Sequence, residues 1–314
     1  MKPLVTVIIP VYNKEKYISR SIQSVLDQSY TQIELLIVDD AATDGSLARV
    51  AEFDDHRIRV IRRETPGPGG YAARNLGVEN SSGEWVAFLD ADDVWLPDHL
   101  ERAVQMTREY PDIPIISAGR INQTGDKQEM DPFTQHFIDD GVKVLYLSDY
   151  LKFACKGMRA MQTNTLLLNR KALFSCKIFP EGRTDRSGDL YAWVQLLARM
   201  KVMVWSPHIS AISYRDVIGV SRTSTPSIKL FRDMVDDLSP YVSREDVKWI
   251  KNFANHMVQY AWLEKKKKRV SLPFSVLPGS FYWSSDPSFC LKWTVISIMP
   301  FGFLEWVHNR YLAG

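Results

Sequence analysis

The chain has 314 residues, of which 45% are hydrophobic, and its formal net charge is +2. This length and hydrophobic content suffice for a full buried core, so the composition excludes a disordered protein. The low net charge excludes the global basic field that is typical of nucleic-acid-binding proteins. Three cysteines without a Cys-x-x-Cys spacing argue against a disulfide framework or a zinc site, and they favour a reducing compartment: Cys155, Cys176 and Cys290.

The apolar stretches near the two ends of the chain predict a protein that stays in the cytoplasm. Residues 4–9 are too short an apolar run for a cleavable signal and are followed by a helix-like segment. Residues 293–304, the longest strongly apolar stretch near the end, fall well below the roughly 20 residues that cross a bilayer. We therefore expect no transmembrane helix.

Short β-branched runs alternate with helix-patterned segments in the first third of the chain. This alternation predicts an α/β fold with a mostly parallel central sheet flanked by helices on both faces. The expected strands are continuous apolar runs, as for strands buried on both faces, at residues 4–9, 33–38, 58–61 and 85–89. Residues 14–28 and 190–200 are expected to be helical, and residues 202–205 form a further expected strand.

Polar residues follow three of the expected strands where each strand ends. The first is followed by Pro10 and Tyr12, the second by Asp40, and the fourth by Asp90 and Asp92. Ligands of open parallel sheets bind at the carboxyl ends of the strands, so these residues are expected to share one crevice. Two carboxylates spaced two residues apart can present oxygen atoms to a hard cation and to a ribose.

Four motifs in this region resemble those of family 2 glycosyltransferases. They read Val-Ile-Ile-Pro-Val-Tyr-Asn at residues 7–13, Val-Asp-Asp at 38–40, Ala-Arg-Asn at 73–75 and Leu-Asp-Ala-Asp-Asp at 89–93. They occur in the family's order and at its separations across the first third of the chain, which makes a chance match to all four very improbable. The resemblance implies a GT-A fold and inversion of configuration at the anomeric carbon.

The resemblance also implies which residues hold the sugar donor. The nucleobase would be contacted by Pro10, Tyr12 and Asp40, the nucleotide or its phosphates by Arg74, and the ribose by Asp90. Asp92 would be the direct metal ligand, and Mn²⁺ or Mg²⁺ is the expected cofactor because oxygen ligands suit both ions. A later segment resembles a loop that closes over the diphosphate and would contribute Arg215 and Arg222.

The catalytic base of the family usually lies in a Glu-Asp pair that opens a helix four residues before a tryptophan. The matching residues here are Gly188, Asp189 and Trp193, so the acid with the base role is kept and its usual neighbour is replaced. A carboxylate that accepts the proton of a sugar hydroxyl contributes roughly 10²–10⁴-fold in rate. Asp189 is therefore the expected base.

The expected reaction is the transfer of one hexosyl or N-acetylhexosaminyl unit from a nucleotide sugar, UDP by family habit, to a hydroxyl of a glycan or lipid-linked glycan in polysaccharide biosynthesis. A binding subunit with weakened catalysis is one alternative, favoured only by Gly188. A sugar nucleotidyltransferase is another, but it would normally carry a glycine-rich loop after the first strand, where this chain has Pro10-Val11-Tyr12-Asn13. The glycosyltransferase interpretation is the one we adopt.

The domain organisation follows from the change of pattern along the chain. Residues 1–225 are expected to form the GT-A domain, with a nucleotide-binding half at 1–110 and an acceptor half at 111–225. Residues 226–314 are expected to form a helical appendage.

The basic run Lys-Lys-Lys-Lys-Arg at residues 265–269 predicts peripheral contact with an anionic membrane at its cytoplasmic face. Aromatic residues, which favour the lipid headgroup boundary, follow it: Phe281, Tyr282, Trp283, Trp293, Phe301, Phe303 and Trp306. The alternative is that the basic run is a solvated helix face and that the aromatic residues pack on the catalytic domain or on a second subunit of a homo-oligomer.

Overall fold

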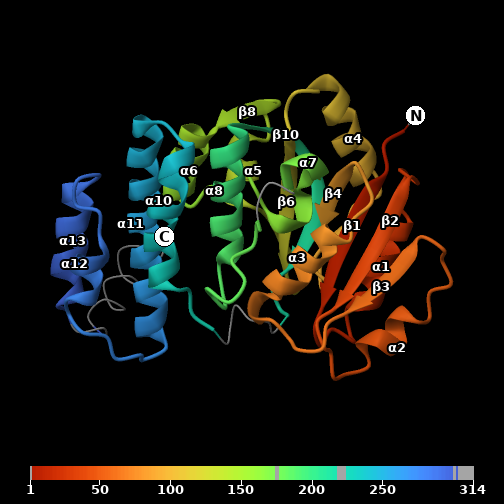
Figure 1. Ribbon diagram of the computed structural model, residues 1–314, viewed down its shortest axis with the longest axis horizontal. Helices are drawn as coiled ribbons and strands as arrows, with labels where there is room; N and C mark the ends of the chain where they lie inside the picture. The colour runs from red at the N-terminus through yellow and green to blue at the C-terminus, as the bar shows by residue number, and fades with distance from the viewer. Residues whose placement is uncertain (1, 174–176, 218–223, 300–301, 303–314) are drawn as a thin grey trace. The chain divides into compact units, whose positions relative to one another are not determined.

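The computed structural model describes residues 2–173, 177–217, 224–299 and 302 (Figure 1). These residues form two compact units, within Met1–Arg222 and Thr223–Gly314, and each unit is described by itself.

The described part of the first unit contains one ten-stranded sheet. Its strands are β1 (Val5–Val11), β2 (Ile33–Asp39), β3 (Ile58–Arg62), β4 (Trp85–Phe88), β5 (Val94–Trp95), β6 (Ile115–Thr124), β7 (Lys127–Met130), β8 (Lys143–Tyr146), β9 (Leu167–Asn169) and β10 (Val202–Tyr214). The order is β3-β2-β1-β4-β9-β6-β10-β5, with β7 beside β6 and β8 beside β10. The strands β3, β2, β1 and β4 are parallel to one another, β6 is parallel to β10, and β9 runs antiparallel between β4 and β6.

Helices cover both faces of this sheet, as predicted from the sequence (Figure 1). They are α1 (Ile18–Leu26), α2 (Ser46–Val50), α3 (Tyr71–Glu79), α4 (His99–Glu109), α5 (Pro132–Phe137), α6 (Leu147–Cys155), α7 (Arg170–Leu173) and α8 (Gly188–Met200), with short 3₁₀ turns η1 (Pro68–Gly70) and η2 (Thr163–Thr165). Because successive side chains of a strand point to opposite faces, β1 contributes side chains to the core on each face of the sheet. Val5 and Val7 belong to the core that α1 and α4 cover.

The opposite face of the sheet carries an aromatic core beneath α3 and α8. The rings of Phe88, Phe179 and Trp193 pack with centroid separations of 5.4 to 6.4 Å. Gly77 of α3 lies directly over Ile8, because a Cβ atom on Gly77 would come within 2.5 Å of the Ile8 side chain. Gly77 thus lets α3, which carries Arg74, lie close to the sheet, and the packing of Trp193 holds α8, which carries Asp189, on the same face.

Two expectations about individual elements are wrong. The helix predicted over residues 14–28 begins only at Ile18, because Asn13 has a positive φ of 52° and residues 14–17 form a turn in which Tyr17 N donates to Lys14 O. The strand at 58–61 is not buried on both faces. β3 is the edge strand beside β2, and Val60 is 41% exposed.

The second unit is helical in its described part. It contains α10 (Ile228–Leu238), η3 (Ser239–Tyr241), α11 (Arg244–Lys267), α12 (Val276–Ser280) and α13 (Pro287–Ser297). The apolar stripe of α10 packs on α11, and Ser243 caps α11 by accepting a hydrogen bond from Asp246 N. Within the described residues, every helix is too short or too polar to cross a membrane.

The residues that suggested a membrane contact differ in burial and in hydrogen bonding. Lys265 and Lys268 donate to Thr225 Oγ1 and Ser224 O, at 3.0 and 2.7 Å. Phe281 is 6% exposed and therefore belongs to the core of this unit, against the expectation of a surface ring, whereas Trp283 is 41% exposed. Three of the residues lie outside the described residues: Phe301, Phe303 and Trp306.

Candidate active site

The carboxyl ends of β2 and β4 bring acidic residues to one edge of the sheet, and four of them have a partner from another segment: Asp40, Asp90, Asp92 and Asp93. Asp40 follows β2 and is 2% exposed. Its carboxylate pairs with Arg63 and accepts from Gly67 N at 3.1 Å. Burial raises the pKa of Asp40, although the Gly67 hydrogen bond and the Arg63 charge oppose that rise. Asp40 therefore anchors the glycine-rich loop before α3, a role that the sequence did not suggest.

Asp90, at the end of β4, forms an ion pair with Arg74 of α3. Arg74 also donates to Gly69 O at 2.9 Å, so it links the glycine-rich loop to the acidic edge of the sheet. Gly69 has a φ of 70°, a conformation that glycine adopts without steric cost. The two residues that the sequence placed at the donor phosphates and ribose are thus in direct contact.

Asp92 lies two residues further on and pairs with Lys14, whose Nζ is 2.5 Å from Oδ2. Its backbone carbonyl accepts a hydrogen bond from Arg20. The side chains of Asp92 and Lys14 are 19% and 18% exposed. The expected metal ligand is therefore reachable from solvent and is held by a single ammonium group.

Asp93, the last acid of the Leu-Asp-Ala-Asp-Asp motif, also belongs to the site, although the motif assigns it no role. It is 4% exposed and accepts hydrogen bonds from Asn164 Nδ2, Ser213 Oγ and Tyr214 N, at 2.7 to 3.0 Å. Burial, together with the charges of Asp90 and Asp92, raises the pKa of Asp93 to about 7. Asp93 ties the end of β4 to η2 and β10.

Asp189 lies in the first turn of α8, which begins two residues before the helix predicted at residues 190–200. Among the described residues, none donates a hydrogen bond to its carboxylate, which leaves both oxygens available to a ligand. The N-cap residue Ser187 makes no side-chain capping bond. Instead, Gly188 N donates to the hydroxyl of Tyr71 from α3, at 2.7 Å.

Tyr71 explains why glycine stands where the family's usual Glu-Asp pair has its first acid. A Cβ atom on Gly188 would lie 2.7 Å from the Tyr71 ring and 2.8 Å from Pro180. Contacts this short do not occur between real side chains, so a larger residue at 188 requires Tyr71 to move. The replacement therefore has a packing reason, and it does not by itself indicate a loss of catalysis.

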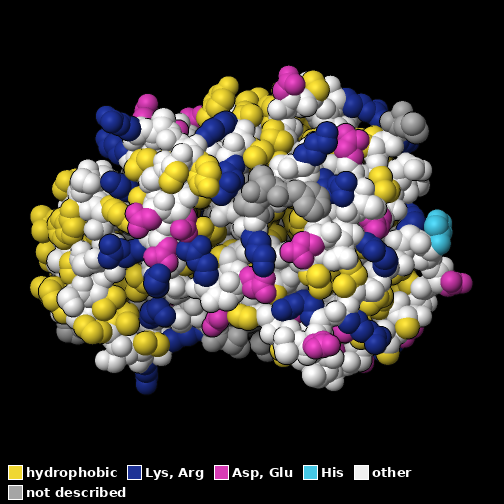
Figure 2. Space-filling model, in the orientation of Figure 1, with side chains coloured by type: hydrophobic (Ala, Val, Ile, Leu, Met, Phe, Trp, Pro, Cys, Tyr) yellow, Lys and Arg dark blue, Asp and Glu magenta, His cyan; other side chains and the backbone are white. Residues whose placement is uncertain are grey.

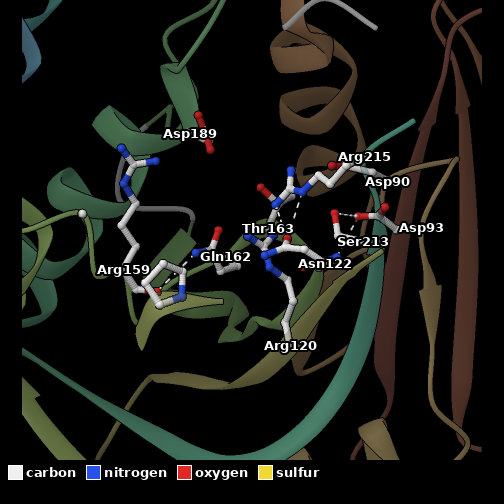
Figure 3. A pocket seen from close by; sticks show the side chains of 13 residues that line it. Asp90, Asp93, Arg120, Asn122, Arg159, Gln162, Thr163, Asp189, Ser213 and Arg215 are labelled. Carbon is white, nitrogen blue, oxygen red and sulfur yellow. Dashed lines mark hydrogen bonds between the residues drawn. The ribbon is translucent and has the colours of Figure 1, made fainter. Parts of the chain in front are cut away.

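A cavity of about 300 Å³ brings part of the predicted site together (Figure 3). Asp90 and Asp93 line it at the end of β4, and Asp189 lines it from α8. Arg215 also lines it and donates to Asn122 Oδ1 at 2.9 Å. The other residues on its wall come largely from β6, η2 and the segment before η2: Arg120, Asn122, Pro132, Gly157, Arg159, Gln162, Thr163, Asn164 and Ser213.

The remaining predicted donor residues do not line this cavity. Tyr12 is 45% exposed and Pro10 is half-buried at the end of β1. Asp40, Arg74 and Asp92 lie along the same edge of the sheet, in the ion pairs described above. Arg222 lies outside the described residues.

Comparison with known proteins identifies the family. The sequence model of glycosyl transferase family 2 matches residues 6–167. The chain belongs to this family. It is 44% identical over 110 residues to a putative teichuronic acid biosynthesis glycosyltransferase, TuaG, of Bacillus subtilis, and 44% identical over 103 residues to WfgD of Escherichia coli, a UDP-Glc:alpha-D-GlcNAc-diphosphoundecaprenol beta-1,3-glucosyltransferase. These matches cover 34% and 33% of this chain but only 43% and 40% of the two relatives.

Solved structures show that this family 2 member has a GT-A fold. TarS 1–349 of S. aureus in complex with UDP-GlcNAc superposes with a TM-score of 0.71 at 18% identity, over 88% of this chain and 79% of TarS. A mannosyltransferase of Pyrobaculum calidifontis in complex with GDP-Man and Mn²⁺ superposes with a TM-score of 0.58 at 17% identity, over 100% of this chain and 89% of that one. The predicted fold class is confirmed.

We predict that Tyr71→Phe lowers the free energy of unfolding by about 1–3 kcal/mol, because it leaves the Gly188 N–H buried without an acceptor. Urea unfolding of the purified protein measures this change. Tyr150→Phe is the matched control, because the Tyr150 hydroxyl is buried and has no partner among the described residues. Equal effects of the two substitutions would contradict the capping role of Tyr71.

Proposed function

We propose that this chain is an inverting glycosyltransferase that transfers one hexosyl or N-acetylhexosaminyl unit from a UDP-sugar to an acceptor hydroxyl, in the biosynthesis of a cell-surface polysaccharide or glycan. The observation that carries the proposal is the shared cavity, in which Asp189 lies across from Asp90 and Asp93 (Figure 3). Membership of the family and the named activity of WfgD support it. A lipid-linked glycan is the acceptor class that the WfgD name supports.

The residues divide the chemistry between donor and acceptor. Asp189 accepts the proton of the acceptor hydroxyl, and the acceptor oxygen forms its bond to the anomeric carbon. The bond from that carbon to the diphosphate oxygen breaks at the same time, so the nucleoside diphosphate leaves from the opposite face and the configuration inverts. Arg74, already in place beside Asp90, and the arginines 215 and 222 would hold the diphosphate.

The donor site would lie along the edge of the sheet next to these groups. Pro10 and Tyr12 would pack against the uracil, and Asp40 would hold the base through the loop that it anchors at Gly67. The uridine assignment draws support from WfgD, which is named for UDP-Glc, and from TarS, which was solved with UDP-GlcNAc. In this scheme residues 1–110 bind the donor, residues 111–225 bind the acceptor, and residues 226–314 form the appendage.

The carboxylate of Asp92 fits Mn²⁺ or Mg²⁺ held mainly by the substrate. Among the described residues, no group of three or more His, Cys, Asp or Glu could hold a metal. These two ions are often bound through one or two carboxylates and phosphate oxygens of the substrate, so one carboxylate suffices. Asp92 would hold the ion, which supplies compensation for the charge that the leaving diphosphate develops.

We predict that Asp189→Asn reduces sugar transfer about 10²–10⁴-fold while UDP binding stays unchanged, because the amide keeps the shape of the carboxylate but accepts no proton. Release of UDP from UDP-sugars measures the first quantity and calorimetry the second. Asp185→Asn, at an exposed position outside the cavity, is the control. Turnover of Asp189→Asn within about threefold of the wild type is too small a loss for a general base.

We predict that Asp92→Ala abolishes the increase in UDP affinity that Mn²⁺ produces, because the ion loses its protein ligand. Calorimetry with UDP in the presence and absence of Mn²⁺ gives both affinities. The exposed Asp112→Ala provides the control for a change of one surface charge. A metal effect of the same size in Asp92→Ala and in wild type would remove Asp92 from the metal site.

We also propose that the second unit contacts an anionic membrane at the cytoplasmic face. α13 and the residue after it expose apolar side chains at helical spacing, with Leu291, Val295 and Ile298 59%, 45% and 64% exposed. Figure 2 shows hydrophobic side chains gathered over α12 and α13. The basic run 265–269 belongs to the same unit, and each basic residue near an anionic leaflet contributes roughly 1 kcal/mol.

We predict that the full chain sediments with vesicles containing anionic lipid at low salt and is released at high salt, since salt screens the basic residues. Leu291→Ser with Ile298→Ser removes apolar contact area and should lower the bound fraction. Leu4→Ser, at a position 36% exposed in the first unit, is the control. If the wild-type protein stays in the supernatant at low salt, the proposed membrane contact of the second unit is wrong.

A further inference from the structure

Two arginines line the cavity with guanidinium groups that have no partner in the part of the chain that the structure describes. Arg120 comes from β6, and Arg159 from the segment between α6 and η2. Among the described residues, neither guanidinium donates a hydrogen bond or forms an ion pair, and the Nε atom of each is buried without an acceptor. Figure 3 shows both side chains among those that line the cavity.

This arrangement is unfavourable for a protein without a ligand. Arg120 is 9% exposed, and burial, helped by the charge of Arg215, lowers the pKa of Arg120 to about 10. A pKa of 10 still leaves the group charged at neutral pH. A guanidinium has five N–H donors and no acceptor, so a buried one without a partner carries a desolvation cost that an anion would offset.

The acids of the same cavity do not supply that anion. Asp90 is paired with Arg74, and Asp93 accepts its three hydrogen bonds from Asn164, Ser213 and Tyr214. Arg120 and Arg159 form no ion pair with Asp189 in the part of the chain that the structure describes. Two guanidinium groups that line one cavity match a group with several anionic oxygens, because each guanidinium can bind two oxygens side by side.

Arg120 and Arg159 share the cavity with only two of the expected donor residues, Asp90 and Arg215. The other described donor residues do not line it: Pro10, Tyr12, Asp40, Arg74 and Asp92. Arg120 and Arg159 share the cavity with Asp189, the residue that must meet the acceptor hydroxyl. An anion bound there belongs to the acceptor side of the reaction.

We infer that Arg120 and Arg159 bind an anionic group of the acceptor, a phosphate or a carboxylate, and so select an acidic sugar or sugar phosphate over a neutral one. This inference rests on the proposed function, in which Asp189 deprotonates the acceptor. It adds an acceptor-specificity site to the donor and metal sites described above. The phosphate of a sugar 1-phosphate and the carboxylate of a uronic acid share the required chemistry.

The test compares three probes on the full chain with the donor site filled by UDP and Mn²⁺. The probes are N-acetylglucosamine 1-phosphate, glucuronic acid and neutral N-acetylglucosamine, and titration calorimetry or ligand-observed NMR measures their binding. We expect one acidic probe to bind at least about tenfold more tightly than the neutral sugar, because hydrogen bonds to a charged group are roughly twice as strong as neutral ones and the difference corresponds to about tenfold in affinity. The acidic probe that binds identifies phosphate or carboxylate as the recognised group.

The variants are Arg159→Gln and Arg120→Lys, with Arg102→Gln as the control. Arg102 is an exposed arginine of α4 that pairs with Asp98 outside the cavity. We expect each cavity variant to lose about tenfold in affinity for the acidic probe, and the control to lose none. Arg120→Lys keeps the buried charge but loses the paired N–H donors of the guanidinium. Thermal unfolding of every variant reports whether the variant is folded.

Equal binding of acidic and neutral probes, or no binding of either acidic probe, would overturn the inference, and so would wild-type affinity in Arg159→Gln. UDP affinity is measured on the same proteins. If UDP affinity falls in parallel with the acidic probe, the arginines serve the donor instead. If wild-type protein binds no UDP, the proposed function itself fails, whereas intact UDP binding without acid selectivity removes only the acceptor site.

Discussion

Carboxylates at the carboxyl edge of a parallel sheet require cationic or hydrogen-bonding partners, most of all where they are buried as Asp40 and Asp93 are, and the arrangement of the first unit depends on this requirement. Four acids meet there, and each takes its partner from a different segment: Arg63 for Asp40, Arg74 for Asp90, Lys14 for Asp92, and Asn164 with Ser213 for Asp93. A carboxylate buried without such a partner would cost several kcal/mol. The acids therefore hold the turn before α1, the helix α3, the turn η2 and the end of β10 around one edge.

The same pairs leave the site ready for charged ligands. Under the proposed function, the diphosphate would approach Arg74 and the cation would approach Asp92, so ligand charges would join a network whose charges are already balanced in pairs. Asp189 and the arginines 120 and 159 differ from these residues, because none of the three has a hydrogen-bond partner for its charged group among the described residues. Unpaired groups of opposite charge on one cavity suit a substrate that brings both a hydroxyl and an anion.

Much of the sheet could be predicted from the sequence because its strands are local apolar runs. The four strands of the parallel half lie within a few residues of their predicted bounds. The helix over 14–28 was predicted too long, because helical spacing of apolar residues does not reveal the positive φ of Asn13. The exposure of β3 was missed for a related reason, since an apolar run does not say whether its strand lies at an edge of the sheet.

The sequence by itself determined the family, the α/β class and the acids at the strand ends, since motifs and apolar periodicity are properties of neighbouring residues. Only the tertiary structure decided which residues share a cavity. It placed Tyr71 against Gly188, which are 117 positions apart in the chain, and brought Arg120 and Arg159 to the cavity of Asp189. The physical reason is that the partners of buried charges and backbone groups come from distant segments of the chain. The sequence therefore does not distinguish an unpaired arginine from a paired one, and only the three-dimensional surroundings of the side chain do so.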